Sequence, residues 1–336
     1  MDLLWAIIDL LLLPSLVVIL GLITAIVFEA FRRRCNNHTL NEANQFFEDP
    51  NSLKQVQFPS IYDPAEKYIS LIIPAFNEEH RLPAYLDEIM NYFQKRVAKE
   101  QTFSYEVLIV DDGSSDGTNK VAFEFIRKYS IDKVRVILLG RNHGKGEAIR
   151  KGMLHSRGEL LLMLDADGAT KITDLEKLEH QIRLVAEKEL HLGDAVAHDS
   201  SSRISDVPVA AFGSRAHLEE NALATRKWYR NFLMKGFHIV VLLTAGPGIR
   251  DTQCGFKMFT RAAARNLFTN VRLKRWCFDV EIVHLCKRLG IPMLEISVNW
   301  SEIPGSKVTI RSIIHMVWEL GLMSVGYRTG MWNIHI

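Results

Sequence analysis

The chain has 336 residues, of which 48% are hydrophobic and 24% charged, a composition that suits one or two globular domains with a real core. Its formal net charge of +2 is too balanced for a nucleic-acid-binding surface, so we expect no nucleic-acid partner. The four cysteines form no C-x-x-C pair, which argues against a zinc site or disulfide framework and favours free thiols in a reducing compartment.

The first predicted element is an uncharged stretch, residues 10–28, which is long enough to cross a bilayer as a helix. Asp2 precedes it and three arginines follow at 32–34, so the basic flank and the bulk of the chain should lie in the cytosol. A cleaved signal peptide is disfavoured, because the positive charge does not come first and no small-residue cleavage site follows. The alternative is a buried core helix, which Asp9 and Pro14 favour.

From residue 68 onward, apolar runs typical of strands alternate with segments of helical periodicity. Strand-like runs begin at residues 68, 105, 133 and 159, and helical segments begin at residues 81, 118 and 145. This alternation predicts an α/β fold with a mainly parallel sheet that helices cover on both faces. Ligands bind such sheets beyond the carboxyl ends of the strands, where the polar clusters of this sequence lie.

Two carboxylates, Asp165 and Asp167, follow the last of these strands, one residue apart. Both side chains can turn toward one hard cation at the point where the chain leaves the pleat. Mg²⁺ or Mn²⁺ typically takes one or two protein carboxylates together with phosphate oxygens of the substrate. The pair therefore predicts a metal–diphosphate site, the alternative being two capping acids at a helix start.

Three other polar clusters lie at predicted strand ends. Asp111 and Asp112 could hydrogen-bond a ribose or a base edge. Asn77, Glu78 and Glu79 lie where a helix begins, and the alternative to a binding role for them is an N-terminal cap with favourable acids. Lys145 lies between glycines that permit close backbone approach, so it could neutralise phosphate charge, although the P-loop pattern is absent.

In this order, the motifs IIPAFNEEHRL, VDDGSSDGT, GKGEAI and DADGAT resemble the family 2 glycosyltransferases, and most closely the dolichyl-phosphate β-glucosyltransferases of the endoplasmic reticulum. The resemblance continues through AFGSRAHLE, GIRDTQCGFKMFTR, RWCFDVEIVHLCKRLGIP and VNWSEIPGSK, and covers almost all of residues 58–307. It implies a GT-A type nucleotide-sugar-binding fold. It also implies inverting transfer of glucose from UDP-glucose to dolichyl phosphate, to give dolichyl β-D-glucosyl phosphate for N-glycan precursor assembly.

The same resemblance implies roles for individual residues. A divalent cation, Mg²⁺ or Mn²⁺, and the diphosphate are assigned to Asp165 and Asp167. The residues expected to bind the nucleotide sugar are Pro74, Ala75, Phe76, Asn77, Glu78, Asp111, Asp112, Gly113, Lys145, Gly146, Asp165 and Ala166.

The acceptor would be a phosphate monoester, which is already anionic at cytosolic pH because its second pKa is about 6. A general base is then less necessary than for a hydroxyl acceptor, and cations must orient the phosphate instead. The candidates for this task are Arg215, Arg226, Arg230 and Arg250, with a solvated helix face as the alternative for Arg226 and Arg230. The catalytic candidates are Asp167, Arg215, Arg250 and Asp279. Asp279 and Glu281 could bind sugar hydroxyls, orient lysines or form salt bridges at a helix start.

These expectations divide the chain into five parts. They are an N-terminal transmembrane signal anchor (1–30), a linker (31–66), the nucleotide-sugar-binding (67–215) and acceptor-binding (216–304) parts of the catalytic domain, and a membrane-associated C-terminal helix (305–336). Residues 228–249 and 310–332 are predicted to be interfacial helices, with core helices as the alternative. The polar segment 187–208, longer than the family leads us to expect, is predicted to be a solvated insertion loop.

Other functions remain to be weighed. A glycan polymerase would carry Gln-x-x-Arg-Trp and several spans, but Arg272 takes the place of that glutamine. A nucleotidyltransferase would need a glycine-rich loop after the first strand, which is absent. A non-catalytic, membrane-anchored nucleotide-sugar binder would not need cations for an acceptor. The residues themselves do not fix the base or the sugar, so transfer of mannose from GDP-mannose stays an alternative.

Overall fold

The computed structural model describes residues 2–36, 46–48, 55–194, 203–217, 241–242, 244, 246, 248–305 and 309–335. The chain divides into two compact units, which are described separately. The smaller unit comprises Met1–Asn41 with Thr309–Ile334, and the larger comprises Glu42–Val308 with His335–Ile336.

The larger unit is built on a seven-stranded sheet of order β5-β4-β3-β6-β8-β7-β9. Its strands are β3 (Lys67–Ala75), β4 (Tyr105–Asp111), β5 (Val134–Leu138), β6 (Gly158–Met163), β7 (Ala210–Ser214), β8 (Lys257–Thr260) and β9 (Met293–Ser297). Strand β8 runs antiparallel to both of its neighbours, and the other pairs are parallel. A separate antiparallel pair joins β1 (Phe46–Glu48) and β2 (Gln55–Gln57). The predicted α/β class with a mainly parallel sheet is confirmed.

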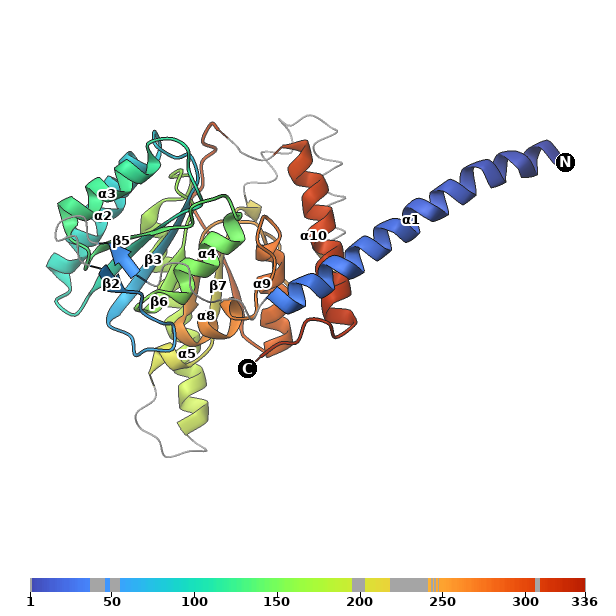
Figure 1. Ribbon diagram of the computed structural model, residues 1–336. Coiled ribbons are helices and arrows are strands. Elements are labelled where there is room, and N and C mark those ends of the chain that lie inside the picture. The colour runs from blue at the N-terminus through green and yellow to red at the C-terminus, as the bar shows by residue number, and fades with distance from the viewer. Residues whose placement is uncertain are drawn as a thin grey trace. The chain divides into compact units, whose positions relative to one another are not determined.

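Helices cover both faces of this sheet (Figure 1). One face packs against α2 (Leu82–Lys99), α3 (Thr118–Tyr129) and α5 (Leu175–Asp194), whose apolar side chains join one continuous core. The other face contacts α4 (Lys145–Leu154) and α8 (Arg261–Phe268), and α9 (Phe278–Leu289) contacts α8. Gly152 lets α4 approach β3 closely, because a Cβ there would lie 2.4 Å from the Ile72 side chain.

The segment predicted to be an insertion loop, 187–208, begins in a helix. Helix α5 continues to Asp194, so the prediction was wrong for residues 187–194. The reason is that Ile182, Ala186 and Leu190 follow one another at four-residue intervals and extend the apolar stripe of the helix. Short 3₁₀ helices, η1 and η2, span Ile172–Asp174 and Ile204–Asp206. Residues 195–202 lie outside the described residues.

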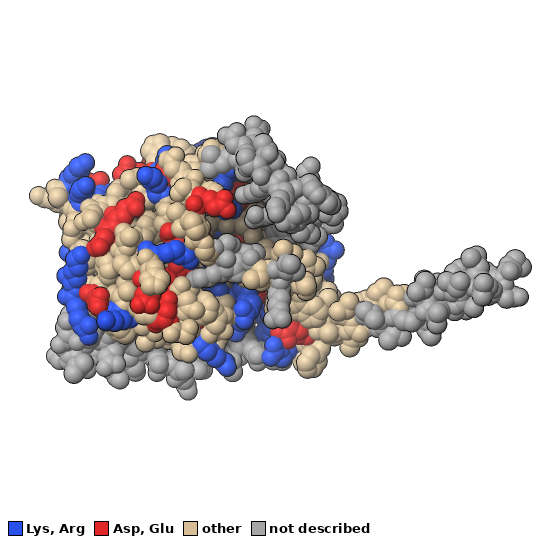
Figure 2. Space-filling view, turned by 90° about the horizontal axis from the view of Figure 1, so that it is seen from above, with Lys and Arg blue, Asp and Glu red and all other residues tan. Residues whose placement is uncertain are grey.

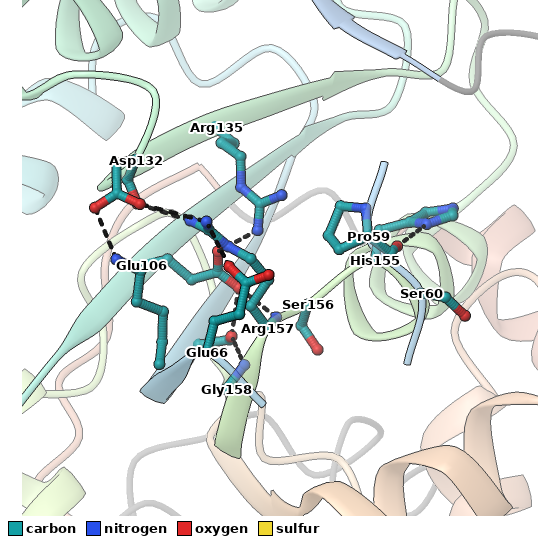
Figure 3. Close-up of polar contacts among 12 residues, drawn as sticks. Pro59, Ser60, Glu66, Glu106, Asp132, Arg135, His155, Ser156, Arg157 and Gly158 are labelled. Carbon is teal, nitrogen blue, oxygen red and sulfur yellow. Dashed lines mark hydrogen bonds and ion pairs between the residues drawn. The ribbon is translucent and has the colours of Figure 1, made fainter. Parts of the chain in front are cut away.

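A cluster of charged side chains that pair with one another lies toward the amino-terminal edge of the parallel strands (Figure 3). Glu106 is fully buried and forms an ion pair with Arg135. Its carboxylate also accepts a hydrogen bond from the Ser70 hydroxyl. Arg157 donates two more, from its backbone N–H at 2.6 Å and from its Nε at 2.8 Å. Burial alone would raise the pKa of the Glu106 carboxyl, but the charges of Arg135 and Arg157 hold it below its ordinary value. The cluster therefore contains its own counter-charges.

The smaller unit pairs two helices, α1 (Asp2–Asn36) and α10 (Ile310–Arg328). The indole N–H of Trp332 donates to the carbonyl oxygen of Ala30 at 2.9 Å. Among the described residues, no helix has the length and hydropathy needed to cross a membrane. The predicted C-terminal helix is confirmed as a helix, whereas nearly all of segment 228–249 lies outside the described residues.

Candidate functional site

The sheet topology gathers the predicted site residues at one edge. Strands β3, β4 and β6 are parallel, so the residues that follow Ala75, Asp111 and Met163 leave the sheet at the same edge. Strand β8 is antiparallel and begins there, because Lys257 pairs with Met163. Strand β7 ends at the same edge and leads to Arg215. Residues from five parts of the chain, the ends of β3, β4, β6 and β7 and the start of β8, therefore meet at this edge.

Charges of both signs are mixed on one face of the described surface. Figure 2 shows Lys and Arg side chains lying beside Asp and Glu side chains on the face drawn. This mixture agrees with the net charge of +2. The site therefore has to be recognised from individual contacts.

A chain of alternating charges leads from the sheet interior to Asp165. The fully buried Lys257 donates to the carbonyl oxygen of Cys254 and to the Asp279 carboxylate, while Lys145 Nζ lies 2.6 Å from Asp165 Oδ1. Burial opposes ionisation of Asp165, but Lys145, followed by Lys257, holds its pKa below the ordinary value. Burial would likewise lower the pKa of Lys145, yet Asp165 and Asp279 raise it. Asp165 is thus ionised and already compensated by Lys145.

Asp279, a predicted catalytic residue, belongs to this chain as a buried partner of Lys257. It is 3% exposed, and burial raises the pKa of its carboxyl. Its ion pair with Lys257, made from the first turn of α9, matches two of the three roles considered for Asp279, the orientation of a lysine and a salt bridge at a helix start. Glu281, two residues further along α9, accepts the backbone N–H groups of Arg272 at 3.0 Å and Leu273 at 2.7 Å, and so fixes the loop before the helix.

Asp167 has a different environment from Asp165. Its side chain is 27% exposed and accepts the Ala169 backbone N–H at 3.1 Å. Its nearest described cation is Arg81, whose Nη1 lies 3.9 Å from Asp167 Oδ2. The described residues contain no group of three or more His, Cys, Asp or Glu side chains that could hold a metal ion. The two aspartates instead fit a cation that takes one or two protein carboxylates and completes its shell with phosphate and water.

The loop after β3 is interlocked with the loop after β4. Asn77 adopts the left-handed backbone region, with φ of 51°, and its N–H donates to Ser114 Oγ at 2.9 Å. The Glu78 N–H donates to Thr118 Oγ1 at 2.8 Å. The buried Glu78 carboxylate accepts two hydrogen bonds of 2.7 Å from Arg81. Asn77 and Glu78 therefore shape this loop, whatever ligand it meets.

The predicted acids after β4 also organise loops. Asp111 accepts the Gly113 backbone N–H at 3.2 Å, and Asp112 accepts those of His143 at 2.6 Å and Gly144 at 2.8 Å. Burial raises the pKa of the Asp112 carboxyl. Asp111 also accepts the Ser114 backbone N–H, at 3.1 and 3.3 Å from its two oxygens. Both aspartates are buried, so their observed role is to fix these loops, and contact with a ribose or base stays a prediction.

The remaining predicted nucleotide-sugar residues are packing or backbone positions. Gly113 has φ of +73°, and a Cβ there would lie 2.4 Å from the Arg141 backbone. A Cβ at Gly146 would lie 2.7 Å from the carbonyl oxygen of Leu273. The others end or follow a strand at this edge, namely Pro74, Ala75, Phe76 and Ala166.

The two described arginine candidates differ in their contacts. Arg215 donates from Nε and Nη2 to Asp251 at 2.8 and 2.9 Å, and its guanidinium lies 5.4 Å from the Trp300 ring centroid. Burial would lower the pKa of Arg215, but Asp251 raises it. Glu295 accepts the backbone N–H groups of Arg250 and Asp251 at 3.0 and 3.1 Å. The exposed Arg250 guanidinium forms no ion pair with a described residue. Two further candidates, Arg226 and Arg230, lie outside the described residues.

Sequence analysis missed five residues at this edge, namely Arg81, Asp251, Lys257, Glu295 and Trp300. One signal was available for Arg81, because it lies three residues after Glu78 at a helix start, a spacing at which opposite charges meet. The pairing of Asp251 with Arg215 spans 36 residues and gave no signal. Lys257 begins the short strand β8, and its partner is identified only by the fold.

The chain is similar to known glycosyltransferases. Residues 70–184 match the family model described as Glycosyl transferase family 2. The dolichyl-phosphate beta-glucosyltransferase of Mus musculus is 44% identical over 96% of this chain and 94% of its own. The Drosophila melanogaster enzyme of that name is 46% identical over 86% and 84%. A solved glucosyl-3-phosphoglycerate synthase from Mycobacterium tuberculosis, in complex with Mn²⁺, UDP-glucose and phosphoglyceric acid, aligns with 79% of this chain and 80% of its own at 15% identity and a TM-score of 0.46.

Proposed function

The chain belongs to the dolichyl-phosphate beta-glucosyltransferases of glycosyl transferase family 2, and from this premise we propose that it transfers glucose from UDP-glucose to dolichyl phosphate. The transfer inverts the anomeric centre and gives dolichyl β-D-glucosyl phosphate for N-glycan precursor assembly. The observation that carries the proposal is the similarity to enzymes of this name along almost the entire chain.

Asp167 is proposed as the main protein ligand of a divalent cation, Mg²⁺ or Mn²⁺, with Asp165 beside it. Such a cation, when bound, stabilises the negative charge that develops on the departing UDP. Two observations support this division of roles. Asp165 already has Lys145 as its counter-charge, whereas Asp167 has only Arg81 at 3.9 Å among the described residues. Lys145, oriented by Asp165, is proposed as a second cation for the diphosphate.

The acceptor phosphate needs orientation more than activation. Its oxygen attacks the anomeric carbon of glucose, the bond from that carbon to UDP breaks, and UDP leaves. Because the phosphate monoester is already anionic near neutral pH, this chain's task is to hold it beside the sugar. Arg250 is exposed and its backbone is fixed by Glu295, which supports a direct contact with the phosphate. Arg215 is proposed to help orient the acceptor phosphate, while Asp251 fixes the position of its guanidinium.

A lipid acceptor requires membrane contact, so we assign the enzyme to the endoplasmic reticulum membrane. Residues 10–28 are proposed as its single anchor, with the larger unit in the cytosol; this proposal rests on the uncharged sequence and its basic flank, because no described helix meets the length and hydropathy of a membrane span. Exposed apolar side chains on α1, such as Leu20, Ile23 and Phe28, support contact with lipid, as does Ile314 on α10. A protease added to sealed microsomes should digest the chain beyond Arg34. Protection of that region would reverse the proposed orientation.

A donor panel tests the proposed reaction. Radiolabelled UDP-glucose and GDP-mannose are each supplied to the full chain with dolichyl phosphate and Mn²⁺, and the lipid products are analysed. We expect glucosyl transfer from UDP-glucose and at most a trace of mannosyl transfer. A mannosyl product would favour the alternative donor. Absence of any lipid product in the presence of bound UDP-glucose would favour a non-catalytic binder.

A further inference from the structure

Arg81 is the one described basic side chain within 4.0 Å of Asp167, and the roles assigned so far give it no task of its own. It immediately precedes α2. Its Nε and Nη2 donate to the two carboxylate oxygens of Glu78, each at 2.7 Å. Its Nη1 donates to the carbonyl oxygen of Pro304 at 3.3 Å and lies 3.9 Å from Asp167 Oδ2. The guanidinium thus joins the loop after β3 to the acid proposed to hold the metal.

The guanidinium of Arg81 keeps capacity for a ligand. Arginine has five N–H donors, and within the described part of the chain three of those of Arg81 are used. The side chain is 22% exposed, so it is open to a bound molecule, and two donors have no hydrogen-bond partner within the described part of the chain. Arg96, at the far end of α2, is a useful contrast. It also binds one carboxylate with two donors, Nη1 and Nη2 to Glu179 at 2.7 and 2.9 Å, but it is only 11% exposed and forms further hydrogen bonds with Glu100.

We propose that Arg81 binds the diphosphate of the donor nucleotide, with Glu78 holding its planar fork in position. This inference rests on the proposed function, because it takes the donor to be UDP-glucose. A planar guanidinium with two remaining donors suits phosphate oxygens. A phosphate that shares a bound cation with the Asp167 carboxylate also lies close to Arg81, since the two side chains lie 3.9 Å apart. Lys145 stands in the corresponding position beside Asp165, so each aspartate has one basic neighbour for the same diphosphate.

A bracing role would have different consequences from a diphosphate contact. If Arg81 served only to brace the loop after β3 through Glu78, its loss would weaken every ligand that uses that loop, including uridine without phosphate. If Arg81 contacts the diphosphate, its loss weakens UDP and UDP-glucose and leaves uridine unchanged. The difference between phosphorylated and unphosphorylated ligands therefore separates the two roles.

The test uses the purified full chain in detergent micelles with Mn²⁺. Calorimetry measures UDP-glucose and UDP binding, and saturation-transfer NMR measures uridine binding. For Arg81→Gln we expect about 10- to 100-fold weaker binding of UDP-glucose and UDP, the size expected for a lost hydrogen bond to a charged group, with uridine unchanged. Arg81→Lys should recover part of the loss, because it keeps the charge but not the fork. Arg96→Gln, the matched control, should leave all three affinities at wild-type values.

Two results would overturn the assignment. One is equal weakening of uridine and UDP by Arg81→Gln, and the other is UDP binding at wild-type strength in that variant. If Arg81→Gln does not fold, Arg81→Lys serves for the same comparison, because weaker UDP with unchanged uridine is still required. A wild-type chain that fails to bind UDP-glucose would overturn the proposed function itself, before any variant is compared.

Discussion

The two edges of the central sheet are both rich in charge, but they treat it differently. At the amino-terminal edge, Glu106 is fully buried and is contacted by two arginines and a hydroxyl. At the carboxyl edge, the side chains of Asp165 and Asp167 are 39% and 27% exposed, and Asp167 has its nearest described cation at 3.9 Å. The first edge satisfies its charges internally, whereas the second leaves negative charge accessible to a ligand.

The comparison shows two different roles for buried or half-buried carboxylates in one sheet. An ionised group inside a protein must be paired, because an isolated charge away from water is very costly. Where the partners come from the chain itself, as around Glu106, the group stabilises the fold. Where the chain supplies fewer partners than the group can use, as at Asp167, the remaining partner is expected to be a ligand. The predictions below test that distinction.

The largest effect on stability should come from the amino-terminal edge. Glu106→Ala leaves Arg135 buried without its counter-charge, so we expect a loss of about 3–5 kcal/mol in the free energy of unfolding. Asp132→Ala, which removes a more exposed partner of Arg157, should cost about 1 kcal/mol or less. Urea unfolding of the full chain in micelles measures both. Equal losses would contradict the idea that burial decides the value of these pairs.

The next largest effect should appear at the carboxyl edge and in catalysis. Arg250→Ala removes an exposed guanidinium and leaves no buried acid unpaired, so the free energy of unfolding should change little. Dolichyl phosphate use should fall about 10- to 100-fold in kcat/KM, while UDP-glucose affinity stays near wild type. Arg250→Lys should restore part of the activity. Kinetics with varied acceptor, alongside calorimetry of the donor, measure the effect. A collapse of donor affinity with unchanged acceptor dependence would assign Arg250 to the diphosphate instead.

A smaller effect should appear in the pH dependence of stability. The pKa of Glu106 is lower in the folded chain than its ordinary value near 4.5. Its contribution is therefore fully present above about pH 4.5 and is lost as pH falls from there through the lower pKa of the folded state. The wild type should lose stability over this acid range more steeply than Glu106→Gln, by about 1.4 kcal/mol for each unit of difference in pKa. Parallel acid profiles from urea midpoints would contradict this assignment.

The sequence was sufficient to predict strands β3, β4, β5 and β6, the three helices between them and the acids at strand ends, whereas strands β7, β8 and β9 were not predicted. These features are local, because an apolar run followed by carboxylates and glycine has one natural place in an α/β sheet. Helix α3 was predicted at the residues where it occurs, 118–129. The tail of α5 was missed because its polar side chains concealed a continuing apolar stripe through Ala186 and Leu190.

The contacts across the carboxyl edge could not be predicted from the sequence, because they depend on strand order. Lys257 meets Asp279, and Arg215 meets Asp251, only because the antiparallel strand β8 is inserted between β6 and β7. Nothing in the four residues of β8 indicates which neighbouring strands they will pair with. The division of roles between Asp165 and Asp167 likewise became visible only once Lys145 was found beside the first of them.

The central claim is that the carboxyl edge keeps negative charge available for a cation and, through it, for the donor diphosphate. Calorimetric titration of UDP-glucose into the full chain tests it most directly, with Mn²⁺, with excess chelator, and with Asp167→Ala in the presence of Mn²⁺. We predict binding with Mn²⁺ and its loss both with chelator and in the variant, whose circular dichroism spectrum should match that of the wild type. Unchanged binding in excess chelator together with wild-type affinity in Asp167→Ala would contradict the account.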